Sequence, residues 1–417
     1  VDAVNDVYWL GDGASFTWPS YRDGWRRYYR ISRSDGAMRP ITGGGFDVDT
    51  VLHIDEEGGW FYFMAAPENP TQLYLFRTRL DGSGQAQRLT PADQPGTHRY
   101  EISKDGRYAF HWYSRFGVPT AVELVRLPGH EVVRTLADNA ELKDKLATLT
   151  KGEAEFFRVD VGDGVELDGW MMKPPDFDPN NQYPVLFYTY GGPWGATAQD
   201  AWAGGNYLWH LMLTQKGYIV MSVDNRGTPV PRGREWRKAI YGRGNAIAAA
   251  DQAAAVRVIR EWPYIDADRI GMWGWSNGGS MSLNAILQYP ELYNTAMAVA
   301  PVPDDRFYDT IYTERYMGMP DQNAEGYRES SPITYAENLK GNLLIVHGTG
   351  DDNVHYQGTE VLMNALIAAN KQFTIMPYPN RSHGIFEGRG TTMHLWTLLT
   401  NYLLEHMPPG PQPQSTN

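Results

Sequence analysis

The chain has 417 residues, a formal net charge of −12, 42% hydrophobic and 21% charged residues, and no cysteine. The acidic balance argues against a nucleic-acid partner, which requires a basic surface. The lack of Cys excludes disulfides, a thiol nucleophile and cysteine-ligated metal sites. No apolar run approaches the roughly 18 residues needed to cross a bilayer, so no membrane span is expected. The length favours two domains.

The chain begins VDAVNDVYW, with neither an initiator Met nor a signal-peptide pattern. This start fits a processed chain or a fragment. The repeats that follow favour the fragment.

Residues 1–138 contain a sequence repeat. The stretches GASFTWPSYRDG, GWFYFMAAPENP and GRYAFHWYSRFG begin at Gly13, Gly59 and Gly106, at intervals of 46 and 47 residues. Each unit holds several short alternating strands separated by Gly, Asp or Pro turns, the pattern of one β-propeller blade. A β-sandwich, the alternative, requires no fixed period. We therefore predict about three blades.

Three blades are too few to close a propeller, which typically needs about four to eight. The missing blades are expected upstream or on another chain.

From residue 139 onward the pattern changes to that of an α/β domain. NAELKDKLATLT (139–150) predicts a short connecting helix. Apolar strands are predicted at 183–190, 218–224, 269–275, 294–300, 342–349 and 373–379. Helices are predicted at 245–262, 358–371 and 391–407. Buried strands separated by helices indicate a mostly parallel, doubly wound sheet over 139–407. The Pro-rich tail 408–417 is predicted to be disordered.

GWSNG (274–278) matches the G-x-S-x-G pattern with a strand before it and a helix after it. This context predicts a sharp turn that exposes the hydroxyl of Ser276. A glycine-rich turn with an incidental serine is the alternative. The remaining catalytic groups decide between the two.

A nucleophilic serine requires a histidine held by a carboxylate, and in α/β hydrolases the chain order is Ser, Asp, His. His383 lies in YPNRSHGIF, a loop just after the last apolar strand. His347 lies within a strand and suits a core or strand-end role. Asp351 and Asp352 are adjacent in HGTGDDNVH, and we select Asp351. All the candidates follow strand ends, where open α/β sheets place their sites.

Acyl transfer also requires two donors for the oxyanion. The backbone N–H of Asn277, directly after the nucleophile, is expected to supply one. The phenolic O–H of Tyr190, in the loop YTYGGPWG, is a candidate for the second, with simple packing as its alternative role.

The sequence resembles the dipeptidyl-peptidase IV branch of the prolyl oligopeptidase (S9) family of serine peptidases. The resemblance is carried by YRDGW, YGGP, GWSNGG, APVPDDRFYDTIYTERYMG and HGTGDDNVHYQ. It implies an α/β hydrolase preceded by the last blades of a β-propeller. The implied activity is release of dipeptides after a penultimate Pro or Ala.

The resemblance also implies roles for single residues. Ser276, Asp351 and His383 would form the triad, and Tyr190 would be the side-chain oxyanion donor. The pocket for the proline ring would be lined by Val302, Tyr308, Tyr312 and Val354, and Asn353 would hold the carbonyl of the substrate's P2 residue. No metal or other cofactor is implied.

Two positions depart from the family pattern. Asn277 and Asp305 stand where the family commonly has aromatic residues, which makes the pocket more polar. The glutamate pair and the arginine with which the family reads the substrate's amine and P2 carbonyl have no recognisable counterpart here. The resemblance further implies a homodimer and a periplasmic or secreted location, with a cytoplasmic one as the alternative.

Other functions remain open at this level. A tripeptidyl or acylaminoacyl peptidase would use the same triad, and so would a carboxylesterase. The repeats argue against the esterase, and the complete triad argues against a non-catalytic relic.

Overall fold

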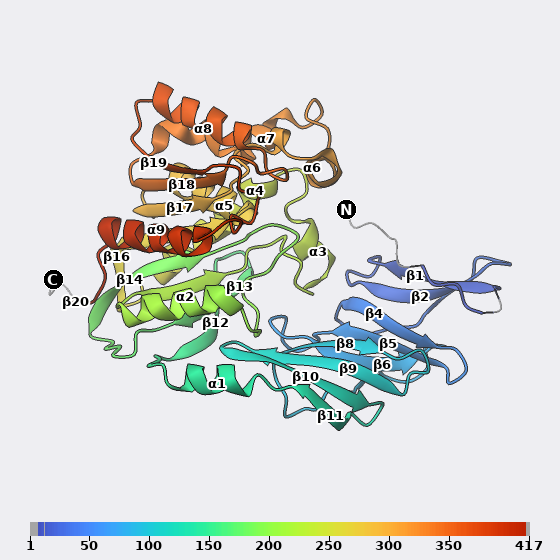
Figure 1. The fold of residues 1–417 in the computed structure, drawn as a ribbon. Helices are drawn as coiled ribbons and strands as arrows, with labels where there is room; N and C mark the ends of the chain where they lie inside the picture. Colours follow the sequence, from blue (N-terminus) through green and yellow to red (C-terminus); the bar gives the residue numbers. More distant parts are fainter. Residues whose placement is uncertain (1–6, 12, 414–417) are drawn as a thin grey trace.

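The computed structural model describes residues 7–11 and 13–413. It comprises three small antiparallel sheets followed by one large mixed sheet covered by helices (Figure 1). The small sheets lie below and to the right of the large sheet in this view. The fold is thus an α/β hydrolase preceded by sheets of the kind that form propeller blades.

The three repeats form three separate antiparallel sheets, as predicted. Gly13, Gly59 and Gly106 adopt left-handed φ values of 64°, 69° and 67° at the same turn of each repeat, a conformation that glycine adopts without steric cost. The first sheet holds β1 (Ser15–Ser20), β2 (Arg27–Ser32) and β3 (Met38–Pro40). The second holds β4 (Val48–Asp55), β5 (Trp60–Ala65), β6 (Tyr74–Arg79) and β7 (Gln87–Arg88). The third holds β8 (Thr97–Ile102), β9 (Tyr108–Arg115), β10 (Val118–Arg126) and β11 (Glu131–Ala137).

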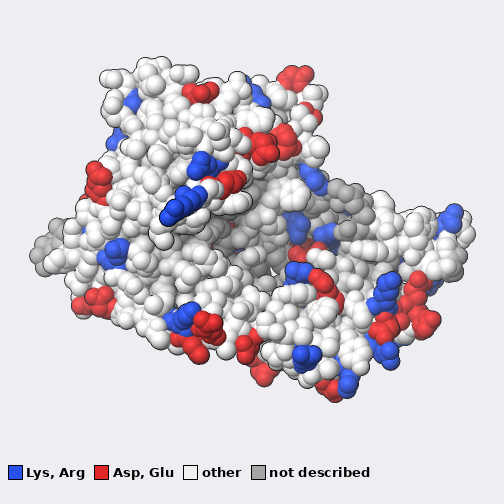
Figure 2. Space-filling model, viewed as in Figure 1, with Lys and Arg blue, Asp and Glu red and all other residues white. Residues whose placement is uncertain are grey.

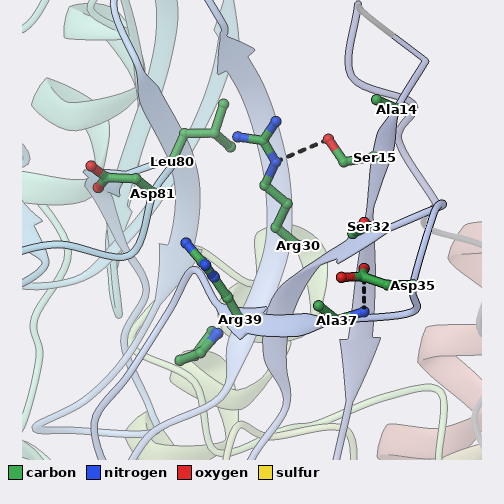
Figure 3. A pocket seen from close by; sticks show the side chains of 10 residues that line it. Ala14, Ser15, Arg30, Ser32, Asp35, Ala37, Arg39, Leu80 and Asp81 are labelled. Atoms are coloured by element: carbon green, nitrogen blue, oxygen red, sulfur yellow. Dashed lines mark hydrogen bonds between the residues drawn. The ribbon is translucent and has the colours of Figure 1, made fainter.

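A cavity of about 340 Å³ lies where the first blade approaches the second (Figure 3). Arg30 and Arg39 line it together with Asp35 and Asp81, so both signs of charge are present. Arg30 donates a hydrogen bond to Ser15, and the Asp35 carboxylate accepts one from the backbone of Ala37. Arg30 and Asp35 thus form hydrogen bonds within the first blade.

After the connecting helix α1 (Ala140–Ala147), the chain builds the large sheet in the order β12-β13-β15-β14-β16-β17-β18-β19. All six predicted strands are present and run parallel: β14 (Asn181–Tyr188), β15 (Ile219–Val223), β16 (Ile265–Trp275), β17 (Thr295–Val299), β18 (Asn342–Gly348) and β19 (Thr374–Tyr378). The sequence did not predict β12 (Ala154–Asp160) and β13 (Glu166–Met172), which form an antiparallel edge. A parallel sheet can carry such an antiparallel edge.

Helices cover both faces of this sheet (Figure 1). One face packs against α2 (Gly204–Gln215) and α9 (Thr391–His406), and the other against α4 (Gly244–Ile259), α5 (Asn277–Gln288) and α8 (Tyr356–Ala368). Within β14, Val185 and Phe187 pack on the face covered by α4, α5 and α8, while Leu186 packs on the face covered by α2 and α9. Alternate residues therefore serve opposite faces, which explains the continuous apolar runs. The shorter helices are α3 (Gly233–Lys238), η1 (Asp305–Phe307), α6 (Thr310–Met317), α7 (Ala324–Ser330) and η2 (Pro332–Asn338).

Two buried carboxylates join the blades to the hydrolase part. Asp200 accepts hydrogen bonds of 2.8 Å from the Gln72 side chain and from the backbone N–H of Phe116. Asp47 accepts one of 2.8 Å from the backbone N–H of Gly233 and one from that of Arg26. Because buried carboxylates need such donors, these contacts fix how the two parts meet.

The prediction of a disordered tail is wrong for residues 408–413. Arg269 donates hydrogen bonds to the carbonyls of Pro408 and Gly410, and β20 (Gln412–Pro413) pairs with the start of β14. The Pro-rich segment is ordered because tertiary contacts hold its carbonyls. Residues 414–417 lie outside the described part of the chain.

Acidic and basic side chains are interspersed over the face seen in Figure 2. Among the described helices, none is both long and apolar enough to cross a membrane.

Candidate active site

Ser276 lies in the turn between β16 and α5, with φ 59° and ψ −121°. This left-handed conformation is rare for a non-glycine residue and marks a strained position. Only glycines fit around it, since a Cβ on Gly274 or Gly278 would lie 2.5 Å or 2.2 Å from the carbonyl oxygen of Thr189. The backbone N–H of Ser276 donates to the carbonyl of Val299 at 2.9 Å. The serine is therefore held at the carboxyl end of the sheet between two neighbouring strands.

Two loops at the same sheet edge bring His383 and Asp351 together. Asp351 follows β18 and His383 follows β19, and Nδ1 of His383 lies 2.7 Å from Oδ2 of Asp351. The indole N–H of Trp275, the residue before Ser276, donates to the carbonyl of His383 at 2.9 Å. This bond fixes the histidine loop beside the serine turn. With Nδ1–H directed at the carboxylate, Nε2 of the imidazole remains to accept a proton.

The structure distinguishes the two adjacent aspartates. Asp351 is buried, while Asp352 is exposed. Oδ1 of Asp351 accepts hydrogen bonds from the backbone N–H groups of Asn353 and Val354, at 3.0 and 2.8 Å. Burial alone would raise the pKa of the Asp351 carboxyl, but bonds from His347, His383 and this backbone outweigh it and hold the pKa well below its usual range. Asp351 is thus the ionised partner of His383.

His347 has a role that sequence reasoning missed. The residue is fully buried, and its Nε2–H is shared between Oδ2 of Asp351 at 3.2 Å and the carbonyl of Val354 at 2.9 Å. Its Nδ1 lies 2.7 Å from the hydroxyl of Thr359. Because both Nε2 partners are acceptors, the ring donates from Nε2 and supports the carboxylate from behind. Its position at the end of β18, four residues before Asp351, was the available signal.

The loop after β14 and the start of α5 are joined through Asn277. The side-chain amide of Asn277 donates to the backbone carbonyl of Tyr190 at 2.8 Å. Two glycines permit this approach: a Cβ on Gly192 would lie 2.9 Å from the Asn277 amide, and one on Gly195 would lie 2.6 Å from the Tyr190 ring. Burial, and to a smaller extent Tyr308, raise the pKa of the Tyr190 phenol. The phenol therefore keeps its proton at neutral pH and can donate it.

A cavity of about 310 Å³ opens onto Ser276. It brings together six of the predicted residues: Tyr190, Ser276, Asn277, Val302, Tyr308 and Tyr312. The remaining lining residues, which the sequence did not single out as pocket residues apart from Asp305, are Trp194, Asp305, Asp309, Ile311 and Arg315. Two of them, Ile311 and Arg315, lie four residues apart on α6, and this helical spacing was the signal available for finding them.

The two pocket tyrosines are arranged edge to face. Tyr308 precedes α6 and Tyr312 lies on it, with ring centroids 5.3 Å apart and planes at 81°. The hydroxyl of Tyr308 donates to the side-chain carbonyl of Asn353 at 2.9 Å, which places Asn353 beside the cavity. Val354, which was expected to line the pocket, is not among its lining residues. It is buried, and its backbone bonds to Asp351 and His347.

In the part of the chain that the structure describes, no group of three or more His, Asp or Glu side chains could hold a metal ion.

The mostly parallel sheet, the strained serine turn and the His–Asp pair at its carboxyl edge define an α/β hydrolase with a nucleophile elbow. Sequence comparison agrees, since the prolyl oligopeptidase family matches residues 207–409 and the dipeptidyl peptidase IV N-terminal region matches residues 2–120. The chain belongs to the dipeptidyl-peptidase IV branch of the prolyl oligopeptidase family.

Solved structures of this branch are similar over nearly the whole chain. The crystal structure of Porphyromonas gingivalis dipeptidyl peptidase 4 has a TM-score of 0.89 at 37% identity and covers 96% of this chain and 55% of that one. A putative dipeptidyl aminopeptidase IV from Bacteroides ovatus has a TM-score of 0.86 at 28% identity, covering 96% of this chain and 59% of its own.

Among curated proteins, a probable dipeptidyl-aminopeptidase B of Aspergillus terreus is 36% identical over 363 residues, which are 86% of this chain and 39% of that protein. A probable dipeptidyl peptidase 4 of Aspergillus flavus is 30% identical over 385 residues, which are 90% of this chain and 49% of that protein. The chain thus spans half or less of the length of these two relatives.

Proposed function

We propose that this chain carries the catalytic site of a serine exopeptidase that releases N-terminal dipeptides with a penultimate Pro or Ala. The observation that carries the proposal is the 2.7 Å contact between His383 and Asp351, held beside the strained Ser276 by the bond from Trp275. The likeness to proteins described as dipeptidyl peptidases supports the choice of substrate class.

In the first half of the reaction, Nε2 of His383 takes the proton of Ser276 as its Oγ attacks the substrate carbonyl. The imidazolium that forms is stabilised by the ionised Asp351, to which its Nδ1–H is already directed. The oxyanion accepts hydrogen bonds from the backbone N–H of Asn277 and the phenol of Tyr190. His383 then gives the proton to the departing amine, which leaves an acyl-enzyme.

In the second half, His383 removes a proton from water, which attacks the acyl carbonyl with the same oxyanion donors in place. Collapse of this intermediate breaks the ester bond, returns the proton to Ser276 and releases the dipeptide. No other covalent group is required.

The side chain next to the scissile bond enters the cavity formed by Val302, Tyr308 and Tyr312. Aromatic faces at right angles and a branched aliphatic side chain suit a small, flat ring, because such a ring packs against them without polar partners. This arrangement supports Pro at the penultimate position.

Four matched substrates test the proposal: the p-nitroanilides of Gly-Pro, Ala-Ala-Pro and acetyl-Ala, and p-nitrophenyl acetate. We expect the highest kcat/KM with Gly-Pro. Preference for Ala-Ala-Pro would indicate a tripeptidyl peptidase, preference for acetyl-Ala an acylaminoacyl peptidase, and turnover of the ester alone an esterase.

A fluorophosphonate probe tests the nucleophile without a peptide substrate. We expect one covalent adduct at Ser276 and none in Ser276→Ala. Absence of both labelling and acyl-enzyme burst would contradict the catalytic assignment.

A further inference from the structure

Asp305 lines the same cavity as Ser276, beside the aromatic and aliphatic side chains expected to hold the substrate. It is the first residue of the short 3-10 turn η1, between β17 and α6. Its backbone carbonyl accepts bonds of 3.2 Å from the backbone N–H of Tyr308 and from the hydroxyl of Thr313. The residue is therefore fixed in place, and its position in the wall does not depend on a mobile loop.

The carboxylate of Asp305 has no partner among the described residues. No residue in the described ranges donates a hydrogen bond to it, and no described Lys or Arg forms an ion pair with it. The adjacent Asp304 shows the contrast, because Arg306 donates to it from its backbone N–H, Nε and Nη2 at 2.9, 2.9 and 2.6 Å. Arg306, the cationic residue nearest to Asp305 in sequence, is thus already bound to Asp304.

The other acidic group of the cavity is also engaged. Oδ1 of Asp309 accepts a 2.8 Å bond from the backbone N–H of Tyr312 and caps α6. Arg315 also lines the cavity, with its guanidinium 5.9 Å from the ring centroids of Trp194 and Tyr316. Asp305 is therefore the acidic group of this cavity that receives no hydrogen bond from a described residue.

Asp305 is partly buried, and its carboxyl oxygens are not fully enclosed, so a ligand in the cavity can reach them. Carboxyls with a shifted pKa in a cavity concentrate at functional sites. Burial raises the pKa of Asp305 to about 7, and the neighbouring Asp304 adds to the rise. A ligand that brings a donor into the cavity gains a hydrogen bond to this carboxyl in place of one from water. A ligand without one leaves the acceptor unpaired, which penalises binding.

We propose that Asp305 is a specificity-determining residue, whose carboxyl accepts a hydrogen bond from the side chain of the residue whose carbonyl Ser276 attacks. The cavity then takes residues bearing a hydroxyl or ammonium group at that position, besides small apolar ones. This inference rests on the proposed function, because it assumes that the penultimate side chain of a peptide enters the cavity.

Isosteric pairs of substrates give the test. Ala-Thr and Ala-Val p-nitroanilides differ by one hydroxyl at equal size, and Ala-Lys and Ala-norleucine differ by an ammonium group. With the native chain we expect kcat/KM to favour Thr over Val, and Lys over norleucine, by ~10-fold. Ratios near one for both pairs would overturn the proposal.

Two variants assign the preference to Asp305. Asp305→Leu removes the acceptor at similar size, and both ratios should fall to about one. Asp305→Asn keeps a carbonyl acceptor without charge, so the Thr preference should persist while the Lys preference is lost. Ratios that persist in Asp305→Leu would exclude this residue as their cause.

A competition experiment separates this inference from the proposed function. Ala-Thr and Ala-Val amides are tested for slowing the labelling of Ser276 by a fluorophosphonate, a readout that needs no peptide turnover. Stronger protection by Ala-Thr supports the role of Asp305 even if no anilide is cleaved, and equal protection contradicts it. The exposed Asp352→Asn variant is the matched control, and thermal melting verifies that each variant folds.

Discussion

The side-chain amide of Asn277 donates a 2.8 Å hydrogen bond to the backbone carbonyl of Tyr190. This bond joins the residue after the candidate nucleophile to the residue that carries the candidate phenolic oxyanion donor. The two groups come from different strand ends, so their separation depends on how the loops are held together. Asn277 therefore contributes through its side chain as well as through its backbone N–H.

Replacing Asn277 by Ala should reduce kcat by ~10-fold with a smaller change in KM, because the backbone donor remains while Tyr190 loses its anchor. Steady-state kinetics with Gly-Pro p-nitroanilide measures the two constants. Asn206→Ala is the matched control, since this side chain on α2 donates to the hydroxyl of Tyr188 at the end of β14. Equal losses in the two variants would contradict a specific role for Asn277.

Removing the hydroxyl of Tyr190 should lower kcat by ~10²–10³-fold in Tyr190→Phe, because one oxyanion donor is lost in the transition state. KM should change little, and Ser276 should still react with a fluorophosphonate. Tyr188→Phe, two residues earlier, removes a hydroxyl that bonds to Asn206 and serves as control. A rise in KM at constant kcat would instead indicate that Tyr190 only binds substrate.

Ser276→Ala should abolish turnover, with a loss of ~10⁴-fold or more, because no other group can form the acyl-enzyme. Ser282→Ala removes a hydroxyl from the same helix, where it bonds to the Gly278 carbonyl. That control should keep its activity and a similar melting temperature. Residual amidase activity in Ser276→Ala within tenfold of the native chain would disprove the assignment.

The adjacent aspartates provide an internal comparison. Asp351→Asn should reduce kcat by ~10⁴-fold, because a neutral amide stabilises neither the required tautomer of His383 nor its imidazolium form. Asp352→Asn, at an exposed position, should stay within about twofold of the native rate. The reverse order of the two losses would move the triad acid to Asp352.

The third blade contains a buried histidine cluster that predicts a pH dependence of stability. Nδ1 of His98 lies 2.9 Å from Nε2 of His111, and His98 Nε2 bonds to the Gln94 carbonyl. Nδ1 of His111 lies 3.3 Å from the Glu123 carboxyl.

Burial lowers the pKa of His98 to about 4 and that of His111 to about 3. Burial also raises the pKa of Glu123. The other titratable groups around the cluster are Tyr100, Tyr113, His130 and Arg88.

Histidines whose folded pKa is depressed contribute stability that is present above the unfolded value of about 6.5 and is lost as the pH falls through the folded pKa. As the pH falls from 6.5 to 4, the free energy of unfolding should therefore decrease by about 1.4 kcal/mol per pH unit for each histidine. Calorimetric melting from pH 7.5 to 4 measures this, and His111→Gln should flatten the dependence. A variant that follows the native curve would show that other groups control acid unfolding.

The blades and the parallel strands were predictable because their signals are local. The glycines of each repeat mark turns that need a left-handed φ, and continuous apolar runs mark strands buried on both faces. The antiparallel pair β12 and β13 was not predicted, since its partly exposed outer strand lacks such a run. The ordered segment 408–413 was also missed, because its order comes from Arg269 and from pairing with β14.

The sequence by itself determined the strand–serine–helix turn and the short list of candidate bases and acids. It did so because each lies directly after a strand, and strand ends of a parallel sheet meet at one edge. Only the tertiary structure decided that Asp351 faces His383, that His347 supports it, and that Asp305 lines the cavity without a donor from any described residue. Such outcomes depend on which side of a loop turns inward and on the donors that distant elements supply. That information is held by the folded arrangement and not by spacing along the chain.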